Sequence, residues 1–360
     1  MIEAGFGEAI DASAWARRLG VSREAVELVR AGDTIDLHLD TMIPPRLWGY
    51  DPLVRHTGGP FGRHFFGHAD LPRLRDGGVA GALWSLTTNP FRSAGARLRA
   101  YRTNRARLRA LAARSGGALV EADTLAGYRA ARARGAHVCL PSIQGANAVE
   151  AAPDGVAELA HDGIVRVTLV HLTNAVYGAT SSPLGAARRD KGLTAAGRRL
   201  VEELDAHRIF VDLAHIHERA FFDAVSVHDR SRPLLVTHTG VTGVRPHWRN
   251  LTDAQLRAIA DSGGTIGIIF QAGFLARPGG PRDAGMIAEH VLHVMRVVGD
   301  DFVSLGSDYD GAITPPPDLP GVDHYPRVVQ QLLDRGVGTE PLRKLLGGNF
   351  LRVLGALRPG

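Results

Sequence analysis

Short runs of apolar residues alternate along the chain with longer segments in which apolar residues recur at helical spacing. Eight runs have the length of a buried strand, at residues 34–40, 79–85, 136–143, 165–171, 209–215, 234–238, 265–270 and 302–308. The helix-like segments between them lie at 98–114, 124–134, 156–162, 194–207, 218–228, 252–263 and 286–299. Near-continuous apolar strands that alternate with helices are typical of a parallel sheet covered by helices.

Eight such strands in a chain of 360 residues predict an α/β fold of the (β/α)8 TIM-barrel type. The competing fold is an open doubly wound sheet, but no GxGxxG pattern follows the first strand. Ahead of that strand, residues 11–31 predict helical structure, with Asp11 or Ser22 as a candidate N-cap. The predicted organisation is a short helical N-terminal extension over residues 1–32 and a single barrel domain over residues 33–360.

Composition narrows the choice of partners and of metal ligands. The net charge is +5, but Lys191 and Lys344 are the only lysines, and the arginine-rich segment 92–114 has the spacing of an amphipathic helix with its arginines toward solvent. We therefore expect no nucleic-acid partner. No apolar run of eighteen residues and no signal-peptide pattern occur, so the sequence predicts a cytoplasmic protein with no membrane partner. A single cysteine leaves His, Asp and Glu as metal ligands.

Polar residues stand at the ends of six of the predicted strands. They are His38 and Asp40, Gln144, His171, Asp212 and His215, His238, and Asp308 and Asp310. In a barrel the carboxyl ends of all strands surround one cavity, where active sites of this fold lie. Residues i and i+2 of a strand share a face, so His38 and Asp40 can bind the same divalent ion, such as Zn²⁺. Asp308 then suits the role of general base toward a water molecule activated by that ion.

Seven ordered motifs with these residues resemble the renal (membrane) dipeptidase family, the zinc dipeptidases of peptidase family M19 among the amidohydrolase-like barrels. The motifs are DLHLD at 36–40, HADLPRLRDGGVAGALWS at 68–85, KGLTAAGRRLVEELD at 191–205, VDLAH at 211–215, THTG at 237–240 with RN at 249–250, LGSDYDG at 305–311, and GGNFLRVL at 347–354. The similarity extends from about residue 30 to residue 355, which is nearly the whole chain.

The resemblance implies a role for each matching residue. His38 and Asp40 correspond to the ligands of one zinc ion, and His215 and His238 to those of the second. His171 corresponds to a histidine that contacts substrate and stabilises the oxyanion. Arg249 corresponds to the arginine that binds the substrate carboxylate, and Asp308 to the catalytic aspartate. Asp308 is also a candidate metal ligand in this chain.

Gln144 departs from the family pattern, which has a glutamate that bridges the two ions at this position. A neutral amide binds through one oxygen and bridges poorly, so we expect fewer than two tightly bound ions, with zinc the preferred metal. Several alternatives stay open. They are a one-metal hydrolase whose ion is held by His38 and Asp40 with a histidine or Asp308, a one-metal hydrolase whose ion is held by His215 and His238, two weakly bound metals, a catalytically silent relative, and an ordinary dipeptidase into which Gln144 was introduced.

The expected activity is a metallodipeptidase-like hydrolysis of a dipeptide or another small amide that bears a carboxylate. Its rival is a homologue with altered or no activity that binds a peptide-like small molecule. A monomer and a homodimer are both compatible with the sequence.

Overall fold

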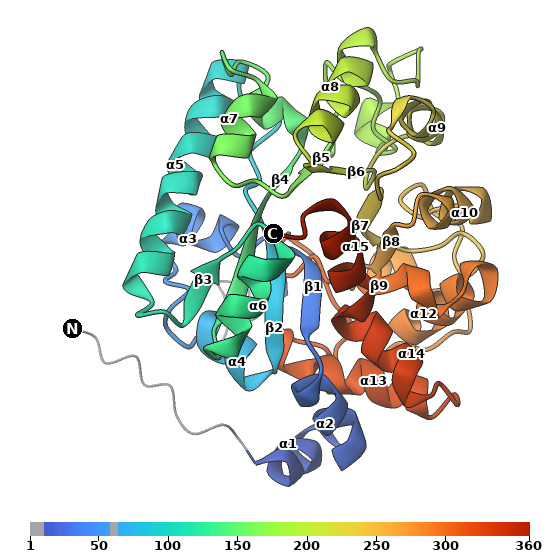
Figure 1. The fold of residues 1–360 in the computed structure, drawn as a ribbon. Helices are drawn as coiled ribbons and strands as arrows, with labels where there is room; N and C mark the ends of the chain where they lie inside the picture. Colours follow the sequence, from blue (N-terminus) through green and yellow to red (C-terminus); the bar gives the residue numbers. More distant parts are fainter. Residues whose placement is uncertain (1–10, 58–63) are drawn as a thin grey trace.

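The barrel is closed in the computed structural model, which describes residues 11–57 and 64–360 (Figure 1). Its strands are β1 (Thr34–Leu39), β2 (Val79–Ser85), β4 (His137–Gln144), β5 (Arg166–Thr168), β6 (Phe210–Asp212), β7 (Leu235–Thr239), β8 (Thr265–Ile268) and β9 (Val303–Leu305). All neighbouring pairs are parallel, in the order β2-β1-β9-β8-β7-β6-β5-β4. The pairing of β2 with β4 closes the circle, with Gly81 opposite Val138 and Ser85 opposite Ser142.

The eight strands predicted from the apolar runs are all present, and closure of the sheet excludes the open doubly wound alternative. A ninth strand, β3 (Leu119–Glu121), was not predicted and pairs in parallel with the first three residues of β4, while β5 pairs with its last three. Only Leu119 of its three residues is buried, so the segment lacks the apolar run by which the other strands are recognised.

Helices surround the strands in Figure 1. In chain order they are α1 (Ala12–Leu19), α2 (Arg23–Ala31), α3 (Ile43–Trp48), α4 (Leu71–Asp76), α5 (Ala94–Arg114), α6 (Leu125–Ala133), α7 (Val156–His161), α8 (Ala195–Ala206), α9 (Glu218–Val227), α10 (Asp253–Asp261), α11 (Ala272–Leu275), α12 (Gly285–Val298), α13 (Tyr325–Leu333), α14 (Thr339–Arg343) and α15 (Asn349–Leu357). None of the described helices is both long and apolar enough to cross a membrane.

One part of the description of α5 from sequence is wrong. Arg97 and Arg105 are buried on the inner side of this helix instead of facing solvent. Each is compensated by a carboxylate, Arg97 by Glu150 and Arg105 by Glu121 at 2.6 Å. Long arginine side chains can lie on an inner face when the guanidinium reaches such a partner.

The helical extension consists of two helices, and both candidate caps are used. The side chain of Asp11 accepts from the amide of Ala14 at the start of α1, and that of Ser22 accepts from the amide of Ala25 at the start of α2. The buried ring of Trp15 donates to the carbonyl of Asp323 at 3.2 Å, which ties α1 to the turn before α13. The division into an extension and a barrel domain at residue 33 stays a prediction.

The last helix covers the side of the barrel opposite to the polar strand ends. The apolar residues of α15, among them Phe350 and Leu354, form one buried cluster with Leu37, Phe210 and Leu235 of the strands. These strand residues precede the polar residues at the carboxyl ends. The barrel interior is therefore apolar toward α15 and polar toward the other end.

Asp323 provides a test of the contact between the extension and the barrel. Burial raises the pKa of this carboxyl, but the hydrogen bond and charge of His324 and the charges of Arg18 and Arg73 outweigh it and lower the pKa to about 2. We expect Asp323→Asn to lower the free energy of unfolding by about 1 kcal/mol at pH 7, a modest value because Arg18 is half exposed.

The sign of the pH dependence follows from the lowered pKa. The stabilisation by Asp323 is fully present above the pKa of the unfolded state and is lost as the pH falls from about 4 toward 2. Urea unfolding of wild type and variant should therefore differ at pH 7 and converge in acid. The exposed Glu202→Gln is the matched control, and an equal effect of both substitutions would contradict the assignment.

Candidate active site

The predicted site residues converge at the carboxyl ends of the strands. The rings of His38 and His238 lie 3.9 Å apart between centroids, those of His215 and His238 4.8 Å, and those of His171 and His215 4.7 Å. The Nε2 atoms of His215 and His238 are 2.8 Å apart. Asp40, Gln144, Arg249 and Asp308 are buried around this histidine cluster, while His171 is partly exposed.

Two of these residues have an unusual backbone. His215 has a φ of 64° and Asp308 a φ of 65°, in the left-handed region that residues other than glycine rarely adopt. Surrounding hydrogen bonds hold both in place: the carbonyl of His215 accepts from the amide of Ser181 at 2.7 Å, and the amide of Asp308 donates to the carbonyl of His38 at 3.0 Å. Such conformations cost energy and concentrate at functional sites.

The orientation of His238 depends on Asp212. The carboxylate of Asp212 accepts from the hydroxyl of Thr237 at 2.7 Å and from its amide at 3.0 Å. The hydroxyl oxygen of Thr237 lies 2.9 Å from Nδ1 of His238. Asp212 therefore supports His238 through Thr237.

His38 has a different neighbour on its rear nitrogen. A guanidinium nitrogen of the fully buried Arg166 lies 2.9 Å from Nδ1 of His38, and Arg166 also lies 3.5 Å from Asp212. On the front side, Nε2 of His38 is 3.6 Å from a carboxylate oxygen of Asp40 and 3.6 Å from one of Asp308. As the shared face of the HxD motif predicted, His38 and Asp40 point to the same place.

Gln144 occupies the middle of the site. Its amide is 3.0 Å from the hydroxyl of Thr87 and 3.1 and 3.3 Å from Nε2 of His215 and His238. Thr87 in turn donates to Asp40 at 2.5 Å. The side chain therefore lies between the Asp40 side of the site and the histidine pair, which is the place of a bridging ligand.

The two carboxylates of the site have opposite pKa shifts. Burial and the nearby charges of Asp40 and Asp36 raise the pKa of Asp308 well above its usual range, against the charges of Arg249 and Arg166. Burial also acts to raise the pKa of Asp40, but its contacts with His38 and Thr87 outweigh this and lower it. Neighbouring carboxyl groups whose pKa values diverge are a common arrangement for acid–base chemistry.

Arg249 lies behind His238 and borders a cleft. One guanidinium nitrogen donates to the carbonyl of His238 at 2.6 Å, while Nε has no partner among the described residues. Burial lowers the pKa of Arg249 to about 10. The cleft has a volume of about 280 Å³ and is also lined by His215, Trp248 and Asn250. Arg249 thus places a buried positive charge, with a donor that has no partner among the described residues, at the edge of the cleft.

The donor set fits a divalent cation. One ligand atom each from His38, His238 and Asp308 lies within 4.8 Å of the others, and all three residues are buried. Nε2 of His38 and Nδ1 of His215 have no hydrogen-bond partner in the part of the chain that the structure describes. Imidazole and carboxylate ligands together suit Zn²⁺ or a similar ion.

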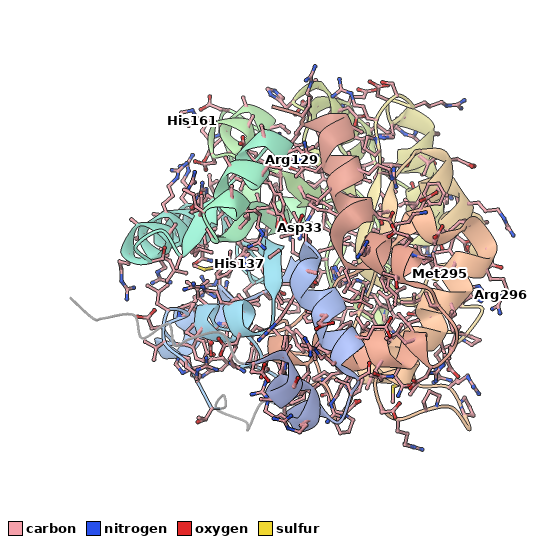
Figure 2. All side chains as sticks on the ribbon, turned by 60° about the horizontal axis from the view of Figure 1, so that its bottom comes forward. Asp33, Arg129, His137, His161, Met295 and Arg296 are labelled. Atoms are coloured by element: carbon pink, nitrogen blue, oxygen red, sulfur yellow. The ribbon has the colours of Figure 1, made fainter. Side chains whose placement is uncertain are left out.

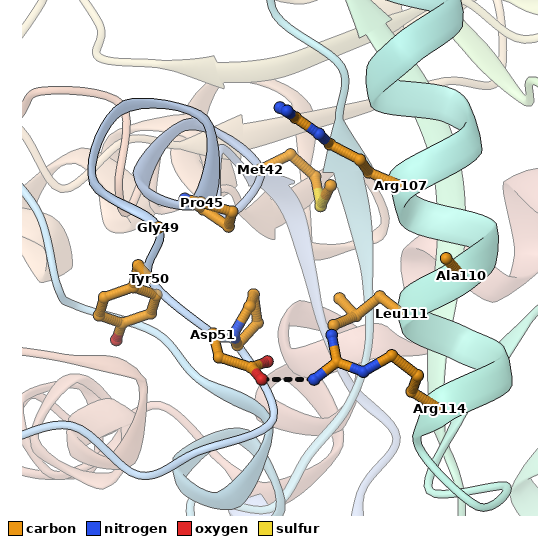
Figure 3. Close-up of a pocket in the computed structure, with 10 residues that line it drawn as sticks. Met42, Pro45, Gly49, Tyr50, Asp51, Arg107, Ala110, Leu111 and Arg114 are labelled. Atoms are coloured by element: carbon orange, nitrogen blue, oxygen red, sulfur yellow. Dashed lines mark hydrogen bonds and ion pairs between the residues drawn. The ribbon is translucent and has the colours of Figure 1, made fainter.

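Other histidines and hollows lie outside this site. His137, labelled in Figure 2, is held at the start of β4 by the carbonyl of Val79 at 2.8 Å and the indole of Trp84 at 3.1 Å, which are structural contacts. A second hollow of about 310 Å³ lies between Pro45 and Tyr50 on one side and α5 on the other, as Figure 3 shows. An ion pair of Asp51 with Arg114 crosses it, and it contains none of the predicted site residues.

Sequence reasoning did not identify three residues that shape the site. Arg166, Thr237 and Thr87 each contact a predicted ligand, but each lies within or beside an apolar run that was interpreted only as a strand. Arg166 did carry a detectable feature, because a charged residue inside the run VRVTLVH is unusual in a buried strand. Thr237 and Thr87 have no such feature, because threonine is common in strands.

Comparisons with known proteins agree with the barrel fold. The family model of membrane dipeptidases (peptidase family M19) matches residues 22–358. The solved dipeptidase AC, a metallopeptidase of family M19, superposes with a TM-score of 0.81 at 27% identity, covering 91% of this chain and 99% of that one. A metallopeptidase from Rhodobacter sphaeroides, solved with a phosphinate mimic of the dipeptide L-Ala-D-Ala, gives 0.80 at 27% identity, with 90% and 99% covered.

Two curated proteins match over about half of the chain. An uncharacterised protein from the pqqA 5′ region of Klebsiella pneumoniae is 41% identical over 181 residues, 49% of this chain and 65% of that protein. Dipeptidase tcpJ of Claviceps purpurea (strain 20.1) is 34% identical over 192 residues, 53% of this chain and 44% of that protein. The matched segments span less than two thirds of either relative. The family resemblance seen in the motifs is confirmed, and the roles of single residues stay predictions.

Thr237 tests the support of His238. Thr237→Val keeps the shape of the side chain but removes the hydroxyl between Asp212 and His238, so divalent-ion affinity should fall by about 10- to 100-fold. Isothermal titration with Zn²⁺ measures the loss. Thr237→Ser, which keeps the hydroxyl, should bind as wild type does. Equal affinity of the Val variant and wild type would show that Thr237 does not orient this ligand.

Proposed function

Because the chain belongs to the membrane dipeptidase family, peptidase family M19, we propose that it is a metal-dependent hydrolase that cleaves the amide bond of a dipeptide or a similar small carboxylate-bearing amide. The observation that carries the proposal is the single buried cluster of His38, His215, His238 and Asp308 with Arg249 beside it. A protein with a purely structural barrel would have no need for this concentration of buried polar groups.

Each residue has a task that its surroundings permit. Asp308, a buried carboxylate 3.6 Å from His38, accepts a proton from the attacking water and delivers it to the leaving amine nitrogen. Burial lowers the pKa of His171 to about 4, so the ring is neutral at neutral pH and donates an N–H to the developing oxyanion. A bound zinc ion would supply a Lewis acid that polarises the carbonyl group and activates the water.

Arg249 holds the carboxylate of the substrate. Its planar guanidinium can form two parallel hydrogen bonds with a carboxylate, and the free Nε faces no protein acceptor among the described residues. The adjacent cleft of about 280 Å³ accommodates a small molecule such as a dipeptide. The partner proposed here is thus a small dipeptide-like substrate. A cytoplasmic location, the absence of a nucleic-acid partner and the choice between monomer and homodimer remain expectations.

Activity and metal content together test the function. Purified protein, with and without added Zn²⁺, is assayed against a panel of dipeptides, and its bound metal is measured by elemental analysis. We expect chelation to abolish hydrolysis and zinc to restore it. A protein that binds dipeptides but hydrolyses none at any metal loading would instead be the silent peptide-binding homologue.

Gln144→Glu tests the electrostatics of the bridging position. We expect wild type to bind fewer than two tightly held ions, and the variant to hold more metal, because the substitution restores a negative charge and a carboxylate that can bridge. Elemental analysis after dialysis against a weak chelator compares the two proteins. Unchanged occupancy would refute the electrostatic argument.

Arg249→Lys tests the carboxylate clamp. Lysine keeps the charge but not the paired donors, so binding should weaken by about 1–3 kcal/mol while metal content stays the same. Steady-state kinetics on a dipeptide and on its C-terminal amide provide the measurement. Wild type should prefer the free acid and the variant should lose most of that preference. Equal turnover of acid and amide by wild type would exclude an anchor at the carboxylate.

A further inference from the structure

A positive charge is built into the barrel directly beneath the site. The guanidinium of Arg166 is fully buried between β1 and β6 and donates to the carbonyl of Ile143 at 2.8 Å and to the hydroxyl of Thr168 at 2.7 Å. Its remaining contacts are Nδ1 of His38 and the carboxylate of Asp212. Arginine stays protonated in proteins, so this charge is permanent.

The contact with Arg166 decides which nitrogen of His38 carries the proton. A guanidinium offers only donors, so Nδ1 of His38 must accept at 2.9 Å. A neutral imidazole that accepts at Nδ1 carries its hydrogen on Nε2. Nε2 is the atom that faces Asp40 and Asp308 at 3.6 Å. In this state Nε2 directs its N–H toward the two carboxylates, beyond hydrogen-bond distance, and has no lone pair for a metal ion.

His238 has the opposite tautomer to His38, with its proton on Nδ1. The single hydroxyl proton of Thr237 goes to the carboxylate of Asp212, which can only accept. The oxygen of Thr237 must then accept from Nδ1–H of His238. Nε2 of His238 is left with a free lone pair directed at Nε2 of His215, 2.8 Å away. Metal-binding histidines normally donate through the other ring nitrogen in this manner.

The same proton count orients the amide of Gln144. Thr87 has one proton, and Asp40 accepts it at 2.5 Å. In the structure Oε1 of Gln144 lies 3.0 Å from the Thr87 hydroxyl and Nε2 faces the two histidines. Because the one proton of Thr87 is donated to Asp40, we infer that the amide is turned by a half-rotation, with its NH₂ group as the donor to Thr87. The amide oxygen then lies beside Nε2 of His215 and His238, at the positions 3.1 and 3.3 Å away. The separations of 3.1 and 3.3 Å are close to those between ligands of one tetrahedral ion with bonds of about 2.0–2.1 Å, while the 2.8 Å between Nε2 of His215 and Nε2 of His238 must widen when the ion binds.

We propose that Arg166 acts as a fixed internal cation that confines metal binding to one ion, held by His215, His238 and the side-chain oxygen of Gln144, while His38 keeps its Nε2–H directed toward Asp40 and Asp308 and binds no metal. The inference rests on the proposed metal-dependent function and specifies the metal centre behind it. Arg166 is a positioning residue, because it acts through His38. A second divalent ion on the His38 side would meet a protonated nitrogen and a nearby positive charge.

Zinc titration of the full-length protein tests which histidines hold the ion. Stripped protein is titrated calorimetrically with Zn²⁺, and the bound metal is counted after gel filtration. Wild type should bind one tight ion. His238→Gln should weaken binding by more than about 100-fold, beyond the loss typical of a supporting residue. The matched variant His38→Gln should stay within about 3-fold of wild type. Two tight ions in wild type, or an equal loss in both variants, would overturn the inference.

Removal of the cation should open the second position. Arg166→Met combined with Gln144→Glu should bind two ions, and adding His38→Gln to this pair should remove the second ion again. Gln144→Glu alone should hold more metal than wild type but fewer than two tight ions. Arg105→Met with Gln144→Glu is the control, since Arg105 is also buried but pairs with Glu121 away from the site. A second ion in the control, or none in the Arg166 variant, contradicts the role of Arg166.

The tautomer of His38 can be measured directly in the wild-type protein. In ¹⁵N-histidine-labelled protein, NMR distinguishes the two imidazole tautomers, and difference spectra with His38→Gln identify the signals of His38. We expect the Nε2–H tautomer for His38 both without and with zinc. An Nδ1–H tautomer, or a shift of Nε2 typical of metal coordination, would overturn the inference.

The two proposals fail in distinguishable ways. Hydrolysis by a protein with two tight ions, or with an ion that depends on His38, leaves the proposed function intact and overturns only the assignment of the metal centre. Protein that binds no zinc and hydrolyses no dipeptide overturns the proposed function and, with it, the inference.

Discussion

The buried ion pair of Asp212 and Arg166 is the interaction on which the rest of the site depends. Asp212 accepts from the hydroxyls of Thr168 and Thr237 and from two backbone amides, and Arg166 lies 3.5 Å away. An uncompensated charge at this depth would be very costly, so each partner requires the other. Through Thr237 the carboxylate directs His238, and through the guanidinium it directs His38. The tautomers of both histidines thus follow from one pair.

Barrel geometry explains why few specific interactions are needed to bring the site residues together. Parallel strands bring the residues at the carboxyl ends of β1, β4, β5, β6, β7 and β9 to one rim, although these strands lie far apart in the sequence. Asp36 and its hydrogen-bonded partner Ser307, for example, are 271 positions apart. The short strands β5 and β6 end early, so the chain leaves the sheet before His171 and His215. The left-handed conformation of His215 then turns its side chain back toward His238. His215 and Asp308 adopt the left-handed conformation at positions where a regular strand would not direct the side chain toward the site.

Much of this arrangement could be predicted from the sequence, since the apolar runs indicate the eight barrel strands and the polar residues after them indicate the rim. The prediction failed where a residue's environment depends on partners distant in the chain. The helical spacing of α5 predicts a solvated face for Arg105, and only the three-dimensional structure places Glu121 beside it. The strand β3 has too little apolar character to be recognised. Arg166 lies within an apolar run, and its meaning appears only once Nδ1 of His38, 128 residues earlier, is placed 2.9 Å from it.

Gln144 and Arg166 both make the charge of the site less negative. A glutamine at the bridging position removes one negative charge from the site, and an internal arginine adds a positive one. Either change alone would leave the site poorly matched to two divalent ions, and together they disfavour the second ion by charge as well as by ligand type. A site with one ion then needs another way to hold Asp40 and Asp308 close together, because two carboxylates repel each other. The Nε2–H group of His38, 3.6 Å from both, lies where it reduces that repulsion.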